Sequence, residues 1–418
     1  MPITSRSGNS GASAIQQEVA RLAAQPEIKS AAAWLRAQEP QFAHWQMQVA
    51  SIPAPPFGES ARAEWLAERF RELGLEDVHI DEAGNVLGMH PGMVGSQCVS
   101  LSAHIDTVFP ANTPLNIRQQ GTRLFGPGVS DNGAGITALL ALAGALQICK
   151  VQHPLPILFV GNVGEEGEGD LRGMRHLFSD GQHGNAIIAS LVLDGAGSDT
   201  IVAEALGSRR FEVIVRGPGG HSWSDFGTPN PIVVLAHAIQ VFSQTPVPAS
   251  PKTTFNIGTI RGGTSVNSIP ESASMRVDIR STSMAEMERL EANLRYAIDA
   301  GIEQAQSNAR SSSQKHIHKL SAEVIAIGNR PAGELDANAR ILHIVRAVDA
   351  HLGNASQIQR ASTDANVPLS LGREAIAIGG GGAGGGAHTL QEWFDCNGRE
   401  LGLKRILLSL LALTGMSE

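Results

Sequence analysis

The amino-acid sequence predicts an α/β protein with a mostly parallel central sheet and a smaller α+β unit inserted into it. Continuous apolar runs of strand length recur along the chain, and a helical segment separates the first two. Apolar runs that alternate with helices are typical of a buried parallel sheet. A central stretch in which apolar and polar residues alternate with period two predicts a second sheet with one exposed face.

Four apolar runs predict the central sheet. A helix is expected over residues 134–149, between the first two runs. Before them, an amphipathic helix is expected over 60–75, where Leu66, Phe70 and Leu73 recur at helical spacing, and a hairpin over 78–88. The four runs are CVSLSA (98–103), LPILFV (155–160), ASLVL (189–193) and AIAI (375–378).

The inserted unit is predicted from three alternating segments, with helices expected over 231–243 and 284–307. A candidate ligand, His388, lies beyond this unit, so the first domain must resume after it. The predicted boundaries are 1–206 and 322–418 for the two parts of the first domain and 207–321 for the insertion. The alternating segments are RRFEVIVRG (209–217), FNIGTIRGG (255–263) and SMRVDIRS (274–281).

Composition limits the function classes. The 418 residues include 32 Lys and Arg against 40 Asp and Glu, a formal charge of −8, which argues against nucleic-acid and anionic-membrane binding. Three scattered cysteines argue against a disulfide framework. The first dozen residues are expected to be a frayed leader without a signal-peptide core, and no apolar run reaches membrane-spanning length. We therefore expect a cytoplasmic protein.

Acidic and imidazole residues follow the ends of the apolar runs, where ligands gather in open α/β sheets. Imidazole and carboxylate groups hold divalent metals, and a two-metal site needs roughly four to six such ligands, one of them shared. No cysteine belongs to the set. The pattern indicates hydrolysis by a water that metal ions activate. The residues are His104, Asp106, Asp131, Glu165, Glu166, Asp194 and His388.

Each of these residues has a plainer alternative when it is taken alone. His104 and Asp106 share a strand face and could be a polar strand end. Asp131, in GPGVSDNGAG, is well placed to be a helix N-cap. The pair Glu165-Glu166 could be a solvated acidic turn.

The two remaining candidates have plain alternatives as well. Asp194 could form a turn with the glycine that follows it, and His388 could be a loop histidine. The glycine run over 379–387 could be a flexible linker. Its place within a strand–loop–helix pattern favours glycine-rich backbone beside a site instead. The joint order and strand-end placement of all the candidates favour the metal site.

Seven segments resemble, in order, the motifs of the M20 metallopeptidase family. The resemblance runs from about Ile52 to the C-terminus, and the opening over 51–88 is most similar to the peptidase T-like (aminotripeptidase) branch. It implies a zinc-peptidase catalytic domain with an inserted ferredoxin-like lid and dimerisation domain. The segments are SLSAHIDTVFP, GPGVSDNGAGITALL, GNVGEEGEGDLRG, LVLDGAG, GPGGHSWSDFG, GTIRGGTSVNSIPESASMRVDIR and GGAHTLQEW.

The resemblance also implies a set of ligands for two Zn²⁺ ions, with Co²⁺ or Mn²⁺ as substitutes. It implies that Asp131 bridges the two ions. His104 and Asp194 are expected on one ion, and Glu166 and His388 on the other. The peptide bond that follows Asp131 is expected to be cis, as in relatives.

The same resemblance implies the catalytic and binding roles. Glu165 is expected to be the general base and Asp106 to orient His104. His221 is expected to reach the active site of a partner subunit and stabilise the oxyanion there, which implies a homodimer through the inserted domain. Asn267 and Arg280 match positions that hold the substrate carboxylate, although a surface strand arginine is the plainer alternative for the second.

We therefore expect a di-zinc hydrolase that cleaves amide bonds of small peptides, acting from the amino end. An N-acyl amino-acid deacylase or a carboxypeptidase of the same family are alternatives. A relative that binds metal or peptide without catalysis, and a hydrolase with a single metal ion, are more distant alternatives. Metal content and a panel of substrates separate these possibilities.

Overall fold

The computed structural model describes residues 8–310 and 320–415, and it divides the chain into two compact units. Unit 1 comprises Met1–Ala205 and Glu334–Glu418, and unit 2 comprises Leu206–Gly333. The insertion predicted from the sequence is present. Its second boundary, predicted at 321/322, lies at 333/334 instead.

A strand that the sequence prediction left outside the insertion moves this boundary. Strand β14 (Ser321–Arg330) pairs antiparallel with β9 (Gly207–Arg216) along nearly its whole length. Ladder hydrogen bonds and the packing that goes with them keep β14 in unit 2. The chain therefore returns to unit 1 only after this strand ends.

Unit 1 is built on a sheet that has nine strands in the described part of the chain. Its strands are β1 (Glu76–Ile80), β2 (Val86–His90), β3 (Cys98–His104), β6 (Ile157–Asn162), β7 (Ile187–Leu193), β8 (Thr200–Ala205), β15 (Gly333–Glu334), β16 (Gln357–Ala361) and β17 (Glu374–Ile378). The order is β1-β2-β6-β3-β7-β17-β8-β15, with β16 beside β8. Strands β6, β3, β7 and β17 are parallel to one another, which confirms the predicted central sheet.

Helices cover both faces of this sheet because its central strands are apolar on both sides. In β6, Ile157 and Phe159 pack into one core while Leu158 and Val160 pack into another. The first core is shared with helices α4 (Ser60–Glu72), α5 (Gly133–Ile148), α9 (Arg340–Leu352) and α11 (Arg399–Thr414). The second is shared with α6 (Arg172–Ser179) and α10 (Asn366–Ser370).

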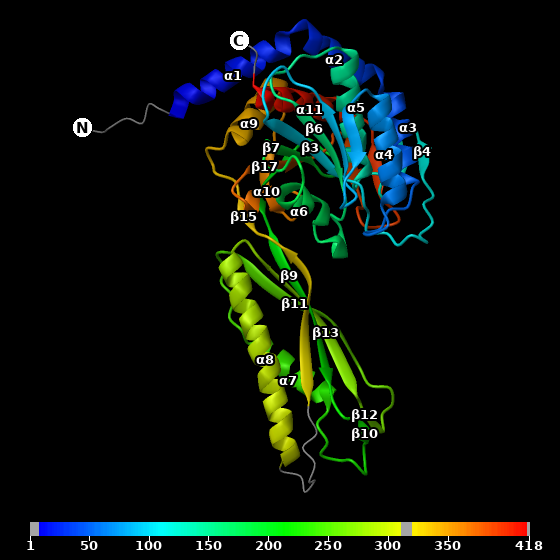
Figure 1. Ribbon diagram of the computed structural model, residues 1–418, viewed down its shortest axis with the longest axis vertical. Coiled ribbons are helices and arrows are strands. Elements are labelled where there is room, and N and C mark those ends of the chain that lie inside the picture. Colours follow the sequence, from blue (N-terminus) through cyan, green and yellow to red (C-terminus); the bar gives the residue numbers. More distant parts are fainter. Residues whose placement is uncertain (1–7, 311–319, 416–418) are drawn as a thin grey trace, which may run out of the picture. The chain divides into compact units, whose positions relative to one another are not determined.

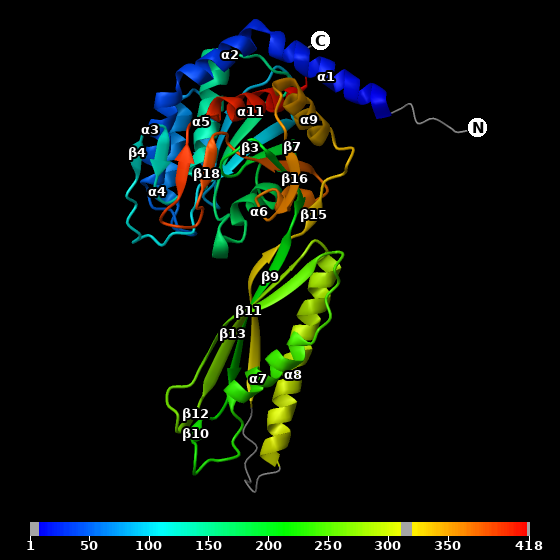
Figure 2. The same ribbon diagram turned by 180° about the vertical axis from the view of Figure 1, so that it is seen from behind.

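Three helices precede the region that the resemblance covers: α1 (Gly8–Ala24), α2 (Pro26–Ala37) and α3 (Glu39–Ala50). Helix α1 packs against α9 and α11, and α3 packs against α5 (Figure 2). The expectation of a frayed leader over the first dozen residues is wrong from residue 8 onward, and residues 1–7 lie outside the described part. No helix among the described residues is both long and apolar enough to cross a membrane.

A small antiparallel sheet lies beside the central one. It consists of β4 (Arg118–Gln120), β5 (Arg123–Phe125), β18 (Ala383–Gly385) and β19 (Trp393–Asp395), in the order β18-β19-β5-β4. The pairing of β5 with β19 joins segments that are about 270 residues apart, as in Phe125 opposite Trp393. This sheet therefore brings the glycine run and its neighbours to the segment that precedes α5.

Unit 2 has the βαββαβ order of a ferredoxin-like fold. Strands β9, β11 (Thr253–Gly262), β13 (Ser272–Ser281) and β14 form an antiparallel sheet in the order β11-β13-β9-β14. Helices α7 (Pro231–Ser243) and α8 (Met284–Arg310) share its core, since residues such as Val213, Val277, Leu235 and Leu294 are packed together. Two short strands, β10 (Gly220–His221) and β12 (Ser268–Ile269), pair at one end of the unit (Figure 1).

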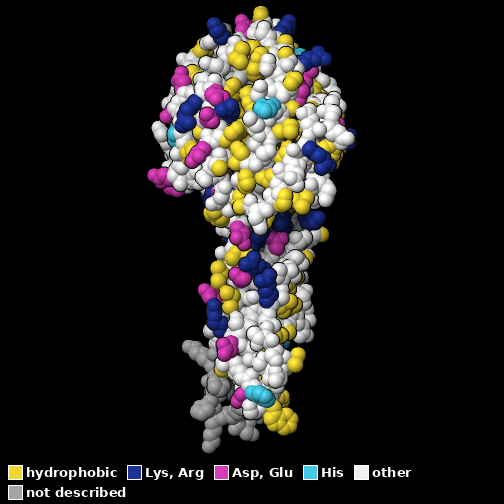
Figure 3. Space-filling model, turned by 90° about the vertical axis from the view of Figure 1, so that its right-hand side faces the viewer, with side chains coloured by type: hydrophobic (Ala, Val, Ile, Leu, Met, Phe, Trp, Pro, Cys, Tyr) yellow, Lys and Arg dark blue, Asp and Glu magenta, His cyan; other side chains and the backbone are white. Residues whose placement is uncertain are grey.

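The face of this sheet opposite the helices carries mixed charges. Alternate residues of β9 and β13 point away from the core and form ion pairs: Arg210 and Arg280 with Asp278, and Arg276 with Glu212. Figure 3 shows basic and acidic side chains interspersed along this face. The period-two alternation seen in the sequence therefore reports one buried and one charged face, as predicted.

Candidate metal centre

The central sheet gathers three of the candidate ligands at one edge. His104 is the last residue of β3, Asp194 directly follows β7, and Glu165 and Glu166 follow β6 after a turn of two residues. These three strands are parallel neighbours. Because parallel strands end at the same edge of a sheet, their following residues must lie close together.

The other two ligands come from loops that tertiary structure brings to this edge. Asp131 lies just before α5, and its bond to Asn132 is cis, as the resemblance implied. The N-cap of α5 is Asn132, whose side-chain oxygen accepts from the N–H of Gly135. The alternative that Asp131 is the cap is therefore wrong, and its carboxylate is available for another purpose. His388 follows the glycine run in a left-handed conformation, with φ of 64°.

Asp131 lies between two imidazoles. Its Oδ1 is 3.1 Å from Nε2 of His104, and its Oδ2 is 3.1 Å from Nε2 of His388. His104 Nε2 is also 3.9 Å from Asp194 Oδ1, and His388 Nε2 is 2.9 Å from Glu166 Oε1. Two sets of donors that could each hold an ion thus share one carboxylate.

The ligand atoms of each set lie within 4.8 Å of one another. One set is His104, Asp131 and Asp194, and the other is Asp131, Glu166 and His388. These are imidazole and carboxylate groups without a thiolate, the donors that divalent ions of the Zn²⁺, Co²⁺ and Mn²⁺ type accept. The residues present therefore fit two ions that share Asp131.

The electrostatics of the cluster favour bound cations. Hydrogen bonding to Asp131 raises the pKa of His388 to about 9. The pKa of His104 is also raised: burial lowers it, but hydrogen bonds to Asp106, Asp131 and Asp194 outweigh that effect. Burial raises the pKa of Asp131, yet the two imidazoles bring it well below its usual range. The carboxylates of the cluster are therefore stabilised by positive charge next to them. Divalent ions would supply more of this charge than protonated imidazoles do.

Asp106 is buried and orients two parts of the centre. Its Oδ1 accepts from the N–H of Glu165 at 3.0 Å, and its Oδ2 accepts from the N–H of Glu166 at 2.7 Å. Its Oδ1 also lies 3.6 Å from Nδ1 of His104. Burial by itself would raise the pKa of this carboxyl. Its contacts with His104 and with the two N–H groups outweigh burial, so the pKa lies below its usual value. Asp106 can therefore hold the imidazole and the acidic pair in fixed positions.

Glu165 and Glu166 are both buried, at 5% and 6% exposure, so the alternative of a solvated acidic turn is wrong. Glu165 lies with His104 and Glu166 in a third group whose ligand atoms are within 4.8 Å. Burial raises the pKa of Glu166. Burying two adjacent carboxylates costs free energy unless a cation lies beside them. A metal ion bound at this centre would be such a cation.

The glycine run is packed against the centre and is not a linker. A methyl group on Gly384 would lie 2.2 Å from Oγ of Ser130, and one on Gly380 would lie 2.8 Å from the carbonyl oxygen of Ala134. Side chains at these positions would push the loop away from the segment that carries Asp131. The absence of side chains is what lets the two segments approach.

Four buried polar residues near the centre were not identified from the sequence as part of it. Glu392 accepts hydrogen bonds from the segment around Asp131, and Gln46 donates to the carbonyl of Val129 in the same segment. Arg62 donates to the carbonyl of Ile105 at 2.9 Å, and Asp364 accepts from Asn162. Glu392 was within a quoted motif, but nothing in its local pattern predicts burial. Arg62 lies in the opening that resembles the peptidase T-like branch, but only as part of a predicted amphipathic helix, and Gln46 and Asp364 lie outside the segments that carry the resemblance.

Burial perturbs three of these groups strongly. It raises the pKa of Asp364 and that of Glu392 to about 7 each. It lowers the pKa of Arg62 to about 10, an effect that the charge of Asp106 partly offsets. Asp364 and Arg62 are 0% and 1% exposed. Perturbed groups of this kind gather at functional sites, and these two lie next to the strand ends that bear the ligands.

The three remaining candidates lie in unit 2. His221 and Asn267 are exposed and adjacent, since the carbonyl of Asn267 accepts from the N–H of Ser222 at 3.0 Å. Arg280 lies near the far end of β13 and donates to Asp278 at 2.7 Å. The structure therefore groups His221 with Asn267 and separates Arg280 from both.

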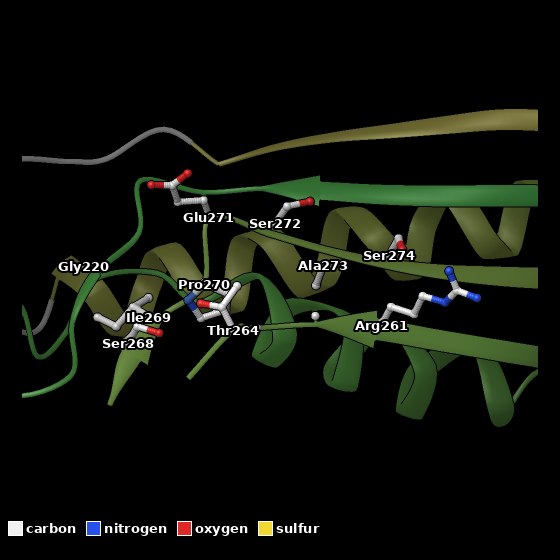
Figure 4. A pocket seen from close by; sticks show the side chains of 12 residues that line it. Gly220, Arg261, Thr264, Ser268, Ile269, Pro270, Glu271, Ser272, Ala273 and Ser274 are labelled. Atoms are coloured by element: carbon white, nitrogen blue, oxygen red, sulfur yellow. The ribbon is translucent and has the colours of Figure 1, made fainter. Parts of the chain in front are cut away.

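A hollow of about 670 Å³ adjoins the pair His221 and Asn267. Gly220 and Ser268, which line it, are neighbours of those two residues in the sequence. Figure 4 shows Arg261, Thr264 and Glu271 around the same hollow, on β11 and on the chain between β11 and β13. This end of unit 2 is thus a recessed surface lined by both polar and apolar residues rather than a closed core.

Residues 100–411, about three quarters of the chain, match peptidase family M20/M25/M40. The chain belongs to this family. The membership that the quoted motifs predicted is therefore confirmed, and the match includes every proposed ligand of the centre. Helices α1–α3 lie before the matched residues.

A curated relative of this M20 protein is named "Probable carboxypeptidase", from Ajellomyces dermatitidis. It is 30% identical over 225 residues, which cover 49% of this chain and 50% of that protein. The chain thus spans about half the length of the curated relatives it matches first.

Solved structures share the fold over nearly the whole chain. The aminopeptidase PepT from Bacillus cereus has a TM-score of 0.71 at 19% identity, over 90% of this chain and 99% of that one. The YxeP protein of Bacillus subtilis, described as a dinuclear metal-binding peptidase of the M20 family, has a TM-score of 0.62 at 14% identity, over 90% and 99%. At these identities the likeness establishes the fold alone, and it confirms the predicted fold class.

Proposed function

We propose that this protein is a di-metal hydrolase that cleaves amide bonds of small peptides, acting from the amino end. The observation that carries the proposal is Asp131, which lies 3.1 Å from each of two imidazoles that belong to separate ligand sets. Two Zn²⁺ ions are the proposed occupants, with Co²⁺ or Mn²⁺ as substitutes. His104 and Asp194 would hold one ion, and Glu166 and His388 the other.

The chain's own groups divide the work of hydrolysis. When bound, the two ions would polarise the substrate carbonyl and lower the pKa of a water in the site. Glu165 takes the proton of the attacking water and delivers it to the leaving amine. Asp106 holds His104 and the two N–H groups of the acidic pair, so the base stays in place. His221 donates to the oxyanion, and Asn267 and Arg280 bind the substrate carboxylate.

Preference for the amino end of a short peptide is supported by the opening of the chain, which resembles the peptidase T-like branch. The same fold is found in an aminopeptidase from Bacillus cereus. A carboxypeptidase is the second candidate, because the curated relatives at about 30% identity carry that name. The two candidates share the metal chemistry and differ in which end of the peptide is bound.

A homodimer is part of the proposal. Asn267 precedes β13 and Arg280 lies near its other end, so that the eight residue-to-residue steps from Ser272 to Arg280 span about 27 Å. A dipeptide or tripeptide is shorter than that separation. One short substrate can contact His221 and Asn267 of one chain and Arg280 of a second chain only if two copies of the protein associate. We also propose a cytoplasmic location, in keeping with three scattered cysteines.

Hydrolysis of a substrate panel tests this function. Zinc- or cobalt-loaded protein is incubated with free tripeptides, dipeptides, N-blocked peptides and N-acetyl amino acids. Release of the amino-terminal residue from free tripeptides, with blocked substrates inert, is the expected result. Release of the carboxy-terminal residue from blocked peptides would establish the carboxypeptidase instead. Turnover of N-acetyl amino acids alone would establish a deacylase.

A further inference from the structure

One buried carboxylate holds the segment that leads into Asp131. Oε1 of Glu392 accepts from the N–H groups of Ser130 and Asp131, each at 2.7 Å. Its Oε2 accepts from the N–H of Gly128 at 2.8 Å. Glu392 is 0% exposed. Three backbone donors of one short segment therefore converge on a single side chain.

The backbone of Glu392 adds a fourth link. Its carbonyl oxygen accepts from the N–H of Gly126 at 2.9 Å. The next residue, Trp393, pairs with Phe125 in the ladder between β19 and β5. The segment 125–131 is thus bound along its length to the segment 392–393.

Glu392 lies four residues after His388. The intervening chain is a tight turn, in which the N–H of Thr389 donates to the carbonyl of Gly386 at 3.1 Å and the N–H of Glu392 donates to the carbonyl of Thr389 at 3.3 Å. A displacement of Glu392 would therefore move both Asp131 and His388. These two residues are 3.1 Å apart, between Oδ2 and Nε2.

We propose that Glu392 is a positioning residue that couples the bridging Asp131 to His388, so that both metal sites form together. The inference rests on the two-metal centre proposed above. Glu392 is not itself a ligand, because both of its oxygens already accept backbone N–H groups. It also belongs to none of the possible ligand sets found among the described residues. Its effect on the ions therefore passes through Asp131 and His388.

A carboxylate suits this place better than an amide of the same shape. Hydrogen bonds from N–H groups to a charged acceptor are roughly twice as strong as those to a neutral one. In Glu392→Gln, the side-chain NH₂ must face at least one backbone N–H, so two donors oppose each other. The variant keeps the volume of the side chain and changes only its hydrogen bonds to the three backbone N–H groups.

The matched control is Glu374→Gln. Glu374 accepts from the N–H groups of Arg340 and Ile341, each at 2.9 Å, at the start of α9. It lies at the opposite end of β17 from the metal centre. The control therefore removes the same kind of bond from the same unit without touching the ligand segments.

The experiment titrates Zn²⁺ and Co²⁺ separately into wild type and both variants after metal removal. We expect Glu392→Gln to bind both ions about 10–100-fold more weakly, the usual effect of disturbing a group that supports ligands. We also expect its cobalt absorption spectrum at saturation to differ from that of wild type, because the ligands are arranged differently. Glu374→Gln should match wild type in both measurements, although its melting temperature falls.

Two results separate the failure of this inference from that of the proposed function. If wild type binds fewer than two ions, the two-metal centre itself is wrong. If wild type binds two ions and Glu392→Gln binds them with the same affinity and the same cobalt spectrum, Glu392 has no positioning role. A lower melting temperature in Glu392→Gln with unchanged metal binding would likewise overturn the inference.

Discussion

At the scale of single residues, the centre depends on buried carboxylates. Burial favours their protonated, neutral form, so neighbouring groups must keep them ionised. Glu165 and Glu166 are at most 6% exposed, and Asp106 is fully buried. Asp106 is held ionised by two backbone N–H groups and His104, whereas the ligand carboxylates face the two imidazoles. Different side chains with the same functional group are thereby prepared for different roles.

Substitution of the proposed base separates catalysis from metal binding. Glu165→Gln should retain two ions per chain and lose about 10²–10⁴-fold in kcat, because a positioned general base contributes that much. The measurement combines metal analysis with peptide hydrolysis, and the exposed neighbour Glu168→Gln is the control. Unchanged turnover in Glu165→Gln would remove the base assignment.

Substitution of the shared ligand should affect both ions. Asp131→Ala removes an oxygen donor from each set, so the purified variant should contain fewer than one ion per chain. Asp194→Ala removes a donor from one set only and should retain one ion. Metal analysis after dialysis against dilute Zn²⁺ checks both. Two ions in Asp131→Ala would show that the bridge does not exist.

At the scale of elements, strand β2 ends in a buried histidine pair away from the ligands. His153 Nδ1 lies 2.7 Å from the carbonyl oxygen of Leu155 and must donate to it, so its Nε2 accepts from His90 Nδ1, also at 2.7 Å. Burial lowers the pKa of both groups, so this pattern belongs to two neutral imidazoles. Burial, followed by the neighbouring His153, lowers the pKa of His90 to about 4. The pair ties the end of β2 to the segment before β6.

This pair predicts a loss of stability in acid. Below the ordinary pKa of 6.5 the unfolded chain binds a proton at His90 that the folded chain refuses, so unfolding becomes easier as pH falls from 6.5 toward 4. Between pH 7 and 5, metal-free wild type should lose about 2 kcal/mol more stability than His90→Gln. Urea unfolding at both pH values measures this. Equal losses in the two proteins would contradict the neutral pair.

At the scale of the whole molecule, the proposed catalytic groups are divided between two units of one chain. The metal ligands and the base are in unit 1, and His221, Asn267 and Arg280 are in unit 2. Within unit 2, His221 and Arg280 lie near opposite ends of the sheet. The proposed dimer is what would allow groups from both ends of that sheet to act on one short substrate.

Mixed dimers test this arrangement. His221→Ala and Glu165→Gln should each be nearly inactive as homodimers. A dimer with one chain of each kind contains one complete site, so random mixing should restore about a quarter of the wild-type activity. Co-expression with two affinity tags isolates the mixed species. Inactive mixed dimers, or an active His221→Ala homodimer, would contradict a site shared between subunits.

Local pattern predicted much of this protein. The apolar runs marked β3, β6, β7 and β17, and the period-two segments marked β9, β11 and β13, because burial on one or both faces leaves a direct trace in the order of residues. Helix α7 was predicted with the bounds that the structure has. The candidate ligand set could be proposed because each of its residues lies at or just after a strand end, or next to a glycine-rich loop.

The sequence by itself determined which segments are buried, which residues are candidate metal ligands, and the family to which the chain belongs. Only the tertiary structure placed β14 in unit 2, made Asn132 rather than Asp131 the N-cap, and brought Glu392 to the N–H groups before Asp131. For β14 and Glu392 the physical reason is the distance along the chain. Glu392 meets Asp131 across 261 residues, and a contact of that kind depends on how sheets and loops pack, which no local period records.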